Sequence, residues 1–169
     1  MQMQTDTKNY FLDEPTAAKK LERMAYEIAE QNLEEKELIL AGIRDNGVTI
    51  ARIIARHLST VLDTRVRVIE IGLDKRHPAG VAISEQLDFN DAVVILVDDV
   101  VNSGKTILYA LKPFLAFYPK KIQTLTLVER THKMFPVASD YVGISLATTL
   151  QEHIFVEVEG DRVTGAYLV

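Results

Sequence analysis

The fold of this chain is decided by residues 93–106, VVILVDDVVNSGKT. The first five residues of this stretch are all apolar, which predicts a strand covered on both faces, as in a parallel sheet. Two adjacent carboxylates, Asp98 and Asp99, end the strand, and a small polar turn around Gly104 leads into a helix. The stretch therefore predicts an α/β protein whose polar groups gather where a central strand ends.

Predicted helices and strands alternate on either side of this stretch. Apolar residues at helical spacing predict helices after Pro15, from Ile50 to Val61, and over 105–117, where Pro113 should kink or shorten the helix. Strands alternating with helices pair in parallel through right-handed crossovers, so we expect a mostly parallel twisted sheet flanked by helices. Residues 1–14 are expected to form a loose arm, and residues 15–169 a single domain. Short apolar or alternating runs predict the strands at 38–41, 65–73, 81–83, 93–97, 124–128, 141–144, 153–158 and 163–169.

Length and composition exclude several classes of protein. The 169 residues include 19 Lys plus Arg and 24 Asp plus Glu, and the resulting net charge of −5 gives no general attraction to nucleic acid. The sequence contains no apolar run of the roughly 20 residues that a membrane-spanning helix needs. The polar N-terminus has no signal-peptide core, and the absence of Cys excludes disulfides and cysteine nucleophiles. We therefore expect a cytoplasmic protein that does not contact membranes.

The turn after the two carboxylates predicts a binding site for a phosphate monoester. Its backbone N–H groups, its hydroxyls and the positive end of the following helix dipole would all face the anion. Asp98 and Asp99 would repel phosphate but would accept hydrogen bonds from vicinal hydroxyls, so a ribose with a 5-phosphate suits both halves of the site. Each charge-assisted hydrogen bond would contribute about 1.5–3 kcal/mol. The residues expected at the 5-phosphate are Asn102, Ser103, Gly104, Lys105 and Thr106.

Two other interpretations of the turn fit the sequence less well. A nucleotide-triphosphate loop of pattern GxxxxGK[ST] needs Gly five positions before Gly104, where this chain has Asp99. A carboxylate at that position would repel the phosphates. A simple helix cap needs one acidic residue, not two at the end of a buried strand. The combination of phosphate and ribose accounts for both the turn and the paired acids.

The same stretch resembles the 5-phosphoribosyl-1-pyrophosphate signature of type I phosphoribosyltransferases, which is an apolar strand, two acids and a small Ser/Thr-Gly-x-Thr turn. From about Leu21 onward the chain is similar to the bifunctional pyrimidine-operon attenuator/uracil phosphoribosyltransferase family. This similarity is carried by residues 40–47, LAGIRDNG, residues 127–132, LVERTH, with Pro136, and residues 140–143, DYVG. It implies the type I phosphoribosyltransferase fold, with a small β-rich hood formed by the termini.

The resemblance also implies a role for each part of the site. Asp98 and Asp99 would be the catalytic carboxylates and would hold the ribose hydroxyls while 5-phosphoribosyl-1-pyrophosphate reacts with a nucleobase, most simply uracil. Mg²⁺ would neutralise the departing pyrophosphate, and no dedicated metal site in the protein is implied. The residues implied at the pyrophosphate are Arg44, Asp45, Asn46 and Gly47, and those bordering the base are Val100, Val101 and Arg130.

Three features depart from the family pattern, and one of them, Lys105, places a cation next to the 5-phosphate, which is compatible with binding. The other two bear on activity. Relatives usually carry a Lys and an Arg in the pyrophosphate loop, whereas this chain keeps Arg44 and has Asn46 at the second position. One lost cation should weaken pyrophosphate stabilisation by about 1.5–3 kcal/mol. The loop that covers the site looks shortened at 74–85, where Lys75, Arg76 and His77 could still supply positive charge. These departures leave open the alternative of a catalytically weak regulator that senses nucleotides.

RNA is a disfavoured partner on sequence grounds. Arg23 matches a basic position of the first helix in the family, but Glu22 and Tyr26 stand where RNA-binding members carry other polar groups. The net negative charge also opposes tight binding to a polyanion. Because relatives assemble into dimers or larger oligomers, the resemblance implies a homo-oligomer.

Overall fold

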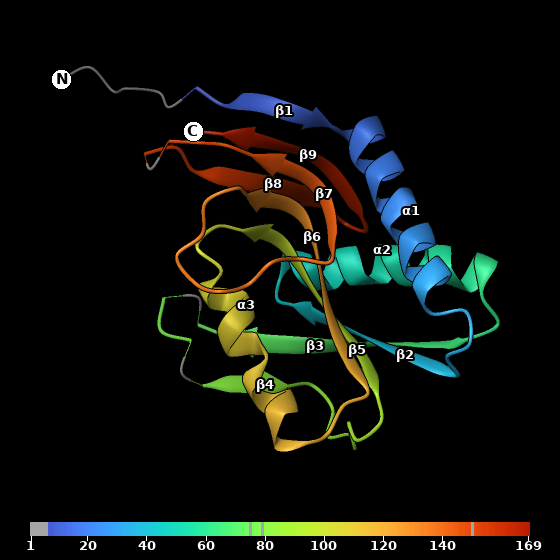
Figure 1. Ribbon diagram of the computed structural model, residues 1–169. Coiled ribbons are helices and arrows are strands. Elements are labelled where there is room, and N and C mark those ends of the chain that lie inside the picture. The colour runs from blue at the N-terminus through green and yellow to red at the C-terminus, as the bar shows by residue number, and fades with distance from the viewer. Residues whose placement is uncertain (1–6, 75, 79, 150) are drawn as a thin grey trace.

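The computed structural model describes residues 7–74, 76–78, 80–149 and 151–169. Its central layer is a six-stranded sheet in the order β4-β3-β2-β5-β6-β7 (Figure 1). Strands β3, β2, β5, β6 and β7 are parallel to their neighbours, and the short β4 runs antiparallel to β3. The predicted α/β fold with a mostly parallel sheet is confirmed. The strands are β2 (Glu37–Ile43), β3 (Arg65–Leu73), β4 (Val81–Ile83), β5 (Val93–Val101), β6 (Lys121–Arg130) and β7 (Tyr141–Leu146).

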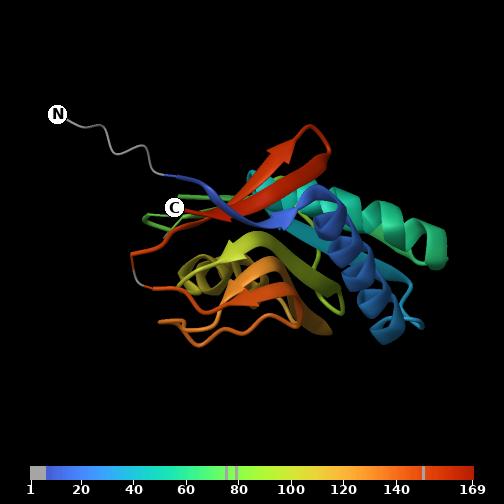
Figure 2. The ribbon, with the colours of Figure 1, turned by 90° about the horizontal axis from the view of Figure 1, so that it is seen from above.

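Helices cover both faces of this sheet. Helices α1 (Glu14–Gln31) and α2 (Asn46–Val61) lie side by side on one face, as the view from above shows (Figure 2). Helix α3 (Lys105–Ala110) and the 3-10 helix η1 (Lys112–Ala116) pack on the other face, around Phe89 and Phe114. The break between α3 and η1 confirms the expectation that Pro113 shortens the predicted helix.

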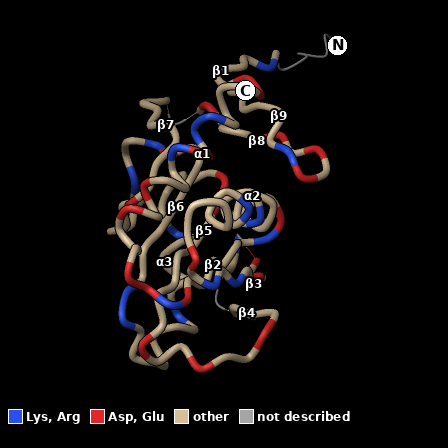
Figure 3. Tube along the Cα trace, turned by 90° about the vertical axis from the view of Figure 1, so that its right-hand side faces the viewer, with Lys and Arg blue, Asp and Glu red and all other residues tan. Residues whose placement is uncertain are grey.

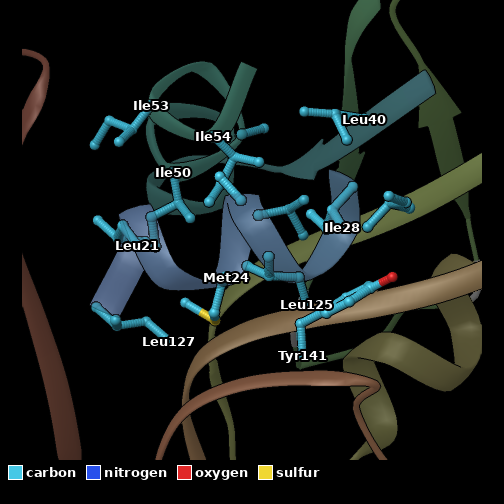
Figure 4. Close-up of a cluster of buried hydrophobic side chains, with 14 of the residues drawn as sticks. Leu21, Met24, Ile28, Leu40, Ile50, Ile53, Ile54, Leu125, Leu127 and Tyr141 are labelled. Carbon is cyan, nitrogen blue, oxygen red and sulfur yellow. The ribbon is translucent and has the colours of Figure 1, made fainter. Parts of the chain in front are cut away.

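The larger of the two cores lies beneath α1 and α2. Met24 and Ile28 of α1 meet Ile54 of α2 and Leu125 of β6 (Figure 4). Each of these four side chains is fully buried. At roughly 1.5–3 kcal/mol per buried aliphatic side chain, this cluster anchors both helices to the sheet. The loops at the carboxyl ends of the strands are thereby held on a rigid base.

A second, three-stranded antiparallel sheet forms the hood, which consists of β1 (Asn9–Asp13), β9 (Arg162–Leu168) and β8 (Ile154–Glu159). It lies at the end of the main sheet where the parallel strands finish (Figure 1). The expectation of a loose arm is wrong for Asn9–Asp13, because this segment pairs with β9 and buries Leu12. A five-residue strand with one buried side chain leaves too weak a pattern to detect in the sequence. Residues 1–6 of the predicted arm lie outside the described residues.

The first helix begins one residue earlier than Pro15 suggested. Asp13 is its N-cap and accepts a hydrogen bond from the Thr16 backbone N–H at 2.9 Å. Hydrogen bonds from the side chain and the backbone of Thr16 hold the pKa of Asp13 below its usual value. Since Asp13 also ends β1, its carboxylate caps α1 at the point where the hood and the helix join.

Candidate functional site

The turn between β5 and α3 forms the wall of a cavity of about 230 Å³. The Ser103 hydroxyl accepts a hydrogen bond from the Lys105 backbone N–H at 3.2 Å, which closes the turn. The six residues of α3 make its dipole smaller than the predicted 105–117 helix would have had, so the backbone N–H groups of the turn matter more. The cavity is lined by Asp98, Val100, Val101, Asn102, Ser103, Gly104, Lys105, Thr106 and Ile107.

The connection between β6 and β7 supports this turn from behind. The Ser103 carbonyl oxygen accepts hydrogen bonds from the backbone N–H groups of Met134 and Phe135, at 3.0 and 3.1 Å. Gly104 has φ +89°, a left-handed conformation that residues with a Cβ rarely adopt. A Cβ at Gly104 would lie 2.4 Å from Cγ2 of Val137. The turn therefore requires Gly104 for both its conformation and its packing.

The two acids at the end of β5 occupy different surroundings, although the sequence suggested a single shared one. Val97 packs toward α1 and α2, whereas Leu96 packs toward α3, and successive residues of a strand alternate in this way. Asp98 accordingly lines the cavity and is only 1% exposed. Asp99 is half-buried on the side of α2. A ligand that contacts both carboxylates must lie across the end of β5.

Backbone hydrogen bonds fix both carboxylates. One oxygen of Asp98 accepts from the Asp99 N–H, and one oxygen of Asp99 accepts from the Val100 N–H, each at 2.8 Å. The other oxygen of Asp99 accepts from the Asn46 side-chain amide at 3.0 Å. Preorganised carboxylates of this kind favour positive charge that develops nearby.

The loop between β2 and α2 contains the residues expected at the pyrophosphate. Gly47 lets the first turn of α2 approach β5, since a Cβ there would lie 2.5 Å from the Val97 carbonyl oxygen. Arg44 and Asp45 are exposed and joined by a cis peptide bond. Asn46 is half-buried and points its amide at Asp99. The structure therefore brings this loop next to the carboxylates of β5, as the sequence suggested.

The cation of this loop has a protein partner that the sequence analysis missed. The Nε of Arg44 lies 3.4 Å from Oε2 of Glu70, and a terminal nitrogen of Arg52 lies 3.2 Å from Oε1 of the same carboxylate. All three side chains are at least one-third exposed, which makes this a solvent-screened pair. The sequence gives no signal of this contact, because Glu70 comes near Arg44 only when β3 pairs with β2 in the sheet.

Arg130, expected beside the base, holds the chain segment that leads to the hood. It donates hydrogen bonds to the backbone oxygens of Thr149 and Glu152, at 3.1 and 2.8 Å. It also donates to Oδ1 of Asn102 at 3.3 Å. Arg130 thus connects the turn after β5 to the segment between β7 and β8. Of the two valines expected at the base, Val101 is buried and Val100 is half-buried, and both line the cavity.

A second pair near the site was also missed. Glu129 is 8% exposed, and its Oε1 lies 3.2 Å from Nζ of Lys133 and accepts from the Ser139 N–H at 3.1 Å. This contact fastens the β6–β7 connection that supports the turn 102–106. Glu129 and Lys133 are four residues apart, and this spacing predicts an ion pair only within a helix, which the sequence does not predict at this place.

The short segment predicted to cover the site is only partly described. Arg76 and His77 are exposed, and Lys75 lies outside the described residues. Across the described parts of the chain, no group of three or more His, Cys, Asp or Glu side chains is placed to hold a metal ion. In the same parts, no helix is long and apolar enough to cross a membrane.

Comparison with known proteins identifies the family of this chain. The phosphoribosyl transferase domain family matches residues 8–160. The chain is 36% identical to the Bifunctional protein PyrR of Clostridioides difficile, over 93% of this chain and 97% of that protein. It is 38% identical to the Bifunctional protein PyrR of Ligilactobacillus salivarius, over 86% of this chain and 87% of that protein.

Solved structures show the same fold at low sequence identity. A hypoxanthine phosphoribosyltransferase from Trypanosoma cruzi superposes with a TM-score of 0.76 at 16% identity, covering 94% of each chain. A hypoxanthine-guanine phosphoribosyltransferase from Bacillus anthracis superposes with a TM-score of 0.72 at 16% identity, covering 94% of this chain and 96% of that one. The family match over most of the chain, the PyrR relatives and the shared fold lead to one conclusion: the chain is a type I phosphoribosyltransferase of the PyrR family.

Proposed function

We propose that this protein transfers phosphoribose from 5-phosphoribosyl-1-pyrophosphate to a pyrimidine base, uracil, and releases pyrophosphate. The observation that carries the proposal is the cavity after β5, where the turn 102–106 and Asp98 form one wall. A phosphate monoester suits the backbone N–H groups and hydroxyls of this turn, and hydroxyls suit the carboxylate beside it.

In this proposal, each part of the site acts on one part of the substrate. The turn 102–106 holds the 5-phosphate, and Asp98 and Asp99 accept hydrogen bonds from the ribose hydroxyls across the end of β5. The bond from C1 to the pyrophosphate oxygen breaks, a bond from C1 to a ring nitrogen of the base forms, and the base loses its proton to solvent. The ribose becomes cationic in between, and the fixed carboxylates stabilise that charge. The backbone near Val100 and Val101, with Arg130, borders the base.

Mg²⁺ fits this site as a partner of the substrate. Mg²⁺ is commonly held by one or two carboxylates together with substrate phosphates, and it keeps several waters. Asp98 and Asp99 offer carboxylate oxygens at the end of β5. When bound there with pyrophosphate, the ion supplies positive charge to the leaving group. We therefore propose Mg²⁺ as the cofactor.

The test is a steady-state assay with 5-phosphoribosyl-1-pyrophosphate, Mg²⁺ and a panel of uracil, hypoxanthine, guanine, xanthine and orotate. Turnover of uracil with release of pyrophosphate supports the proposal, and preferred turnover of another base overturns the choice of uracil. Asp99→Asn should lower kcat/KM about 10- to 100-fold, the size of one charge-assisted hydrogen bond, and should barely change stability. The exposed Asp63→Asn is the matched control and should leave activity unchanged.

A second candidate function, a sensor that binds nucleotides with little turnover, is favoured by one observation. Arg44, the cation of the pyrophosphate loop, is paired with Glu70, and Asn46 is bonded to Asp99. Arg44 and Asn46 thus each have a partner within the protein, although the Arg44 side chain is half exposed. The same assay separates the two functions, because a sensor binds 5-phosphoribosyl-1-pyrophosphate in calorimetry but releases no pyrophosphate with any base.

Partners beyond the small substrates remain predictions. Arg23 donates hydrogen bonds to the carbonyl oxygens of Val142 and Gly143 on β7 and is also paired with Glu27. These contacts leave it less able to hold RNA. In Figure 3 the basic positions are scattered among acidic ones. We accordingly keep RNA as a disfavoured partner, to be tested by a mobility shift with pyrimidine-operon leader RNA at low salt. A homo-oligomer and a cytoplasmic location also stand as predictions.

A further inference from the structure

Asn46 joins three parts of the protein at one point. It is the first residue of α2, and its Nδ2 lies 3.0 Å from Oδ2 of Asp99 on β5. The same Nδ2 lies 3.0 Å from the carbonyl oxygen of Val156, on hood strand β8. The helix, the central strand and the hood therefore meet at this one amide.

The orientation of the Asn46 amide is fixed by its partners. Both are acceptors, a carboxylate oxygen and a carbonyl oxygen, so only the NH₂ end of the amide can face them. An amide nitrogen carries two hydrogens, and each is used here. Gly47, the next residue, brings α2 within contact of the β5 backbone and so keeps Asn46 within reach of Asp99. The donor groups of this side chain are thus committed to the protein.

We propose that Asn46 is a positioning residue, which orients the Asp99 carboxylate toward the ribose hydroxyls and fastens hood strand β8 to it, rather than a side chain that binds pyrophosphate. This inference rests on the proposed function. A side chain in the pyrophosphate loop then acts on the sugar half of the substrate. The loop would contact pyrophosphate through Arg44 and its backbone.

The inference predicts that the two halves of the substrate respond differently to substitution of Asn46. Ribose 5-phosphate carries the sugar diol and the 5-phosphate ester, whereas inorganic pyrophosphate contains no sugar and corresponds to the leaving group. Asn46→Ala should weaken binding of ribose 5-phosphate about 10- to 100-fold and leave binding of Mg²⁺-pyrophosphate within about twofold of the wild type, both measured by calorimetry. Asn46→Asp has nearly the same shape but places a carboxylate against Asp99, and its loss for ribose 5-phosphate should be larger.

A double-variant cycle tests whether the effect passes through Asp99. In the Asp99→Asn background, Asn46→Ala should change ribose 5-phosphate binding by less than about threefold, because the carboxylate to be positioned is gone. Thr60→Ala, an exposed residue at the far end of the same helix, is the matched control and should change neither ligand. Thermal melts establish that each variant is folded, and Asn46→Asp carries the comparison if Asn46→Ala does not fold.

The remaining outcomes all overturn the inference. A loss confined to pyrophosphate makes Asn46 a pyrophosphate ligand, and an equal loss of both ligands makes it a general support of the loop. An absence of effect, or additive losses with Asp99→Asn, excludes positioning of Asp99. A wild-type protein that binds neither ribose 5-phosphate nor 5-phosphoribosyl-1-pyrophosphate instead overturns the proposed function, so the two failures are distinguishable.

Discussion

Replacing Gly104 by Ala tests how the turn 102–106, the proposed phosphate site, is built. Gly104 has φ +89°, and a left-handed conformation costs a residue with a Cβ about 1–2 kcal/mol. The new Cβ would also lie 2.4 Å from Cγ2 of Val137, and overpacking of this kind costs about 1–3 kcal/mol. Gly104→Ala should therefore lower the free energy of unfolding by about 2–5 kcal/mol, a large part of the stability of a domain of this size.

Two further substitutions separate the conformational cost from the packing cost. Gly160 in the β8–β9 turn also has a positive φ, +59°, but nothing lies within 4 Å of the position its Cβ would take. Gly160→Ala should therefore cost only the conformational part, about 1–2 kcal/mol. In a Val137→Ala background the close contact is removed, so Gly104→Ala should also cost only about 1–2 kcal/mol there.

The assay is urea unfolding followed by circular dichroism, since the chain contains no Trp. The double variant Gly104→Ala/Val137→Ala should lose about 1–3 kcal/mol less free energy of unfolding than the sum of the two single losses. Additive losses, within about 0.5 kcal/mol, would refute the reasoning that Val137 fixes this turn. So would equal losses for Gly104→Ala and Gly160→Ala, because the two positions differ in packing and share the sign of φ.

Three other predictions concern the surroundings of the site. Glu70→Gln releases Arg44 from its solvent-screened pair, so the KM for 5-phosphoribosyl-1-pyrophosphate should fall up to about fivefold at low salt and less at high salt. An unchanged KM would mean that Glu70 does not compete with the substrate for Arg44. Arg130→Lys keeps the charge but loses the planar guanidinium, so hydrogen exchange in residues 147–149 and 151–153 should accelerate and the KM for the base should rise. Unchanged exchange would contradict the role of Arg130 in holding this segment. Burial, with Asp140 nearby, raises the pKa of Tyr141 from 10.0 to about 12. Between pH 10 and pH 12 the folded state therefore keeps a proton that the unfolded state loses, so the free energy of unfolding of the wild type should fall across this range. The fall should exceed that of Tyr141→Phe by up to about 3 kcal/mol. Denaturation midpoints measured across this pH range check the difference.

The local pattern of the sequence was sufficient for the order of elements from the first helix onward. Runs such as 93–97 are apolar because β5 is covered by helices on both faces, and that burial is recorded in composition alone. Pro113 marks the end of α3 because its ring removes a backbone donor, which is also a local effect. β1 was missed because its place depends on pairing with β9, at the opposite end of the chain.

The sequence predicts which residues form the candidate site, but the contacts of these residues depend on distances between elements. Asp98, Asp99 and the turn 102–106 stand next to one another in the chain, so their proximity needed no structure. The contacts of Asn46 with Asp99 and Val156 span 53 and 110 residues, and no local pattern encodes them. The pairing of Arg44 with Glu70 likewise arises only when β2 and β3 lie side by side.

The sequence by itself determined the fold class, because burial patterns are local, and its resemblance to known proteins identified the family. It also predicted a phosphate-binding turn from residues that are adjacent along the chain. Only the tertiary structure decided that the two acids leave β5 on opposite faces and that Asn46 faces a carboxylate instead of solvent. The physical reason is that side-chain direction and charge pairing depend on strand alternation and on packing between distant elements.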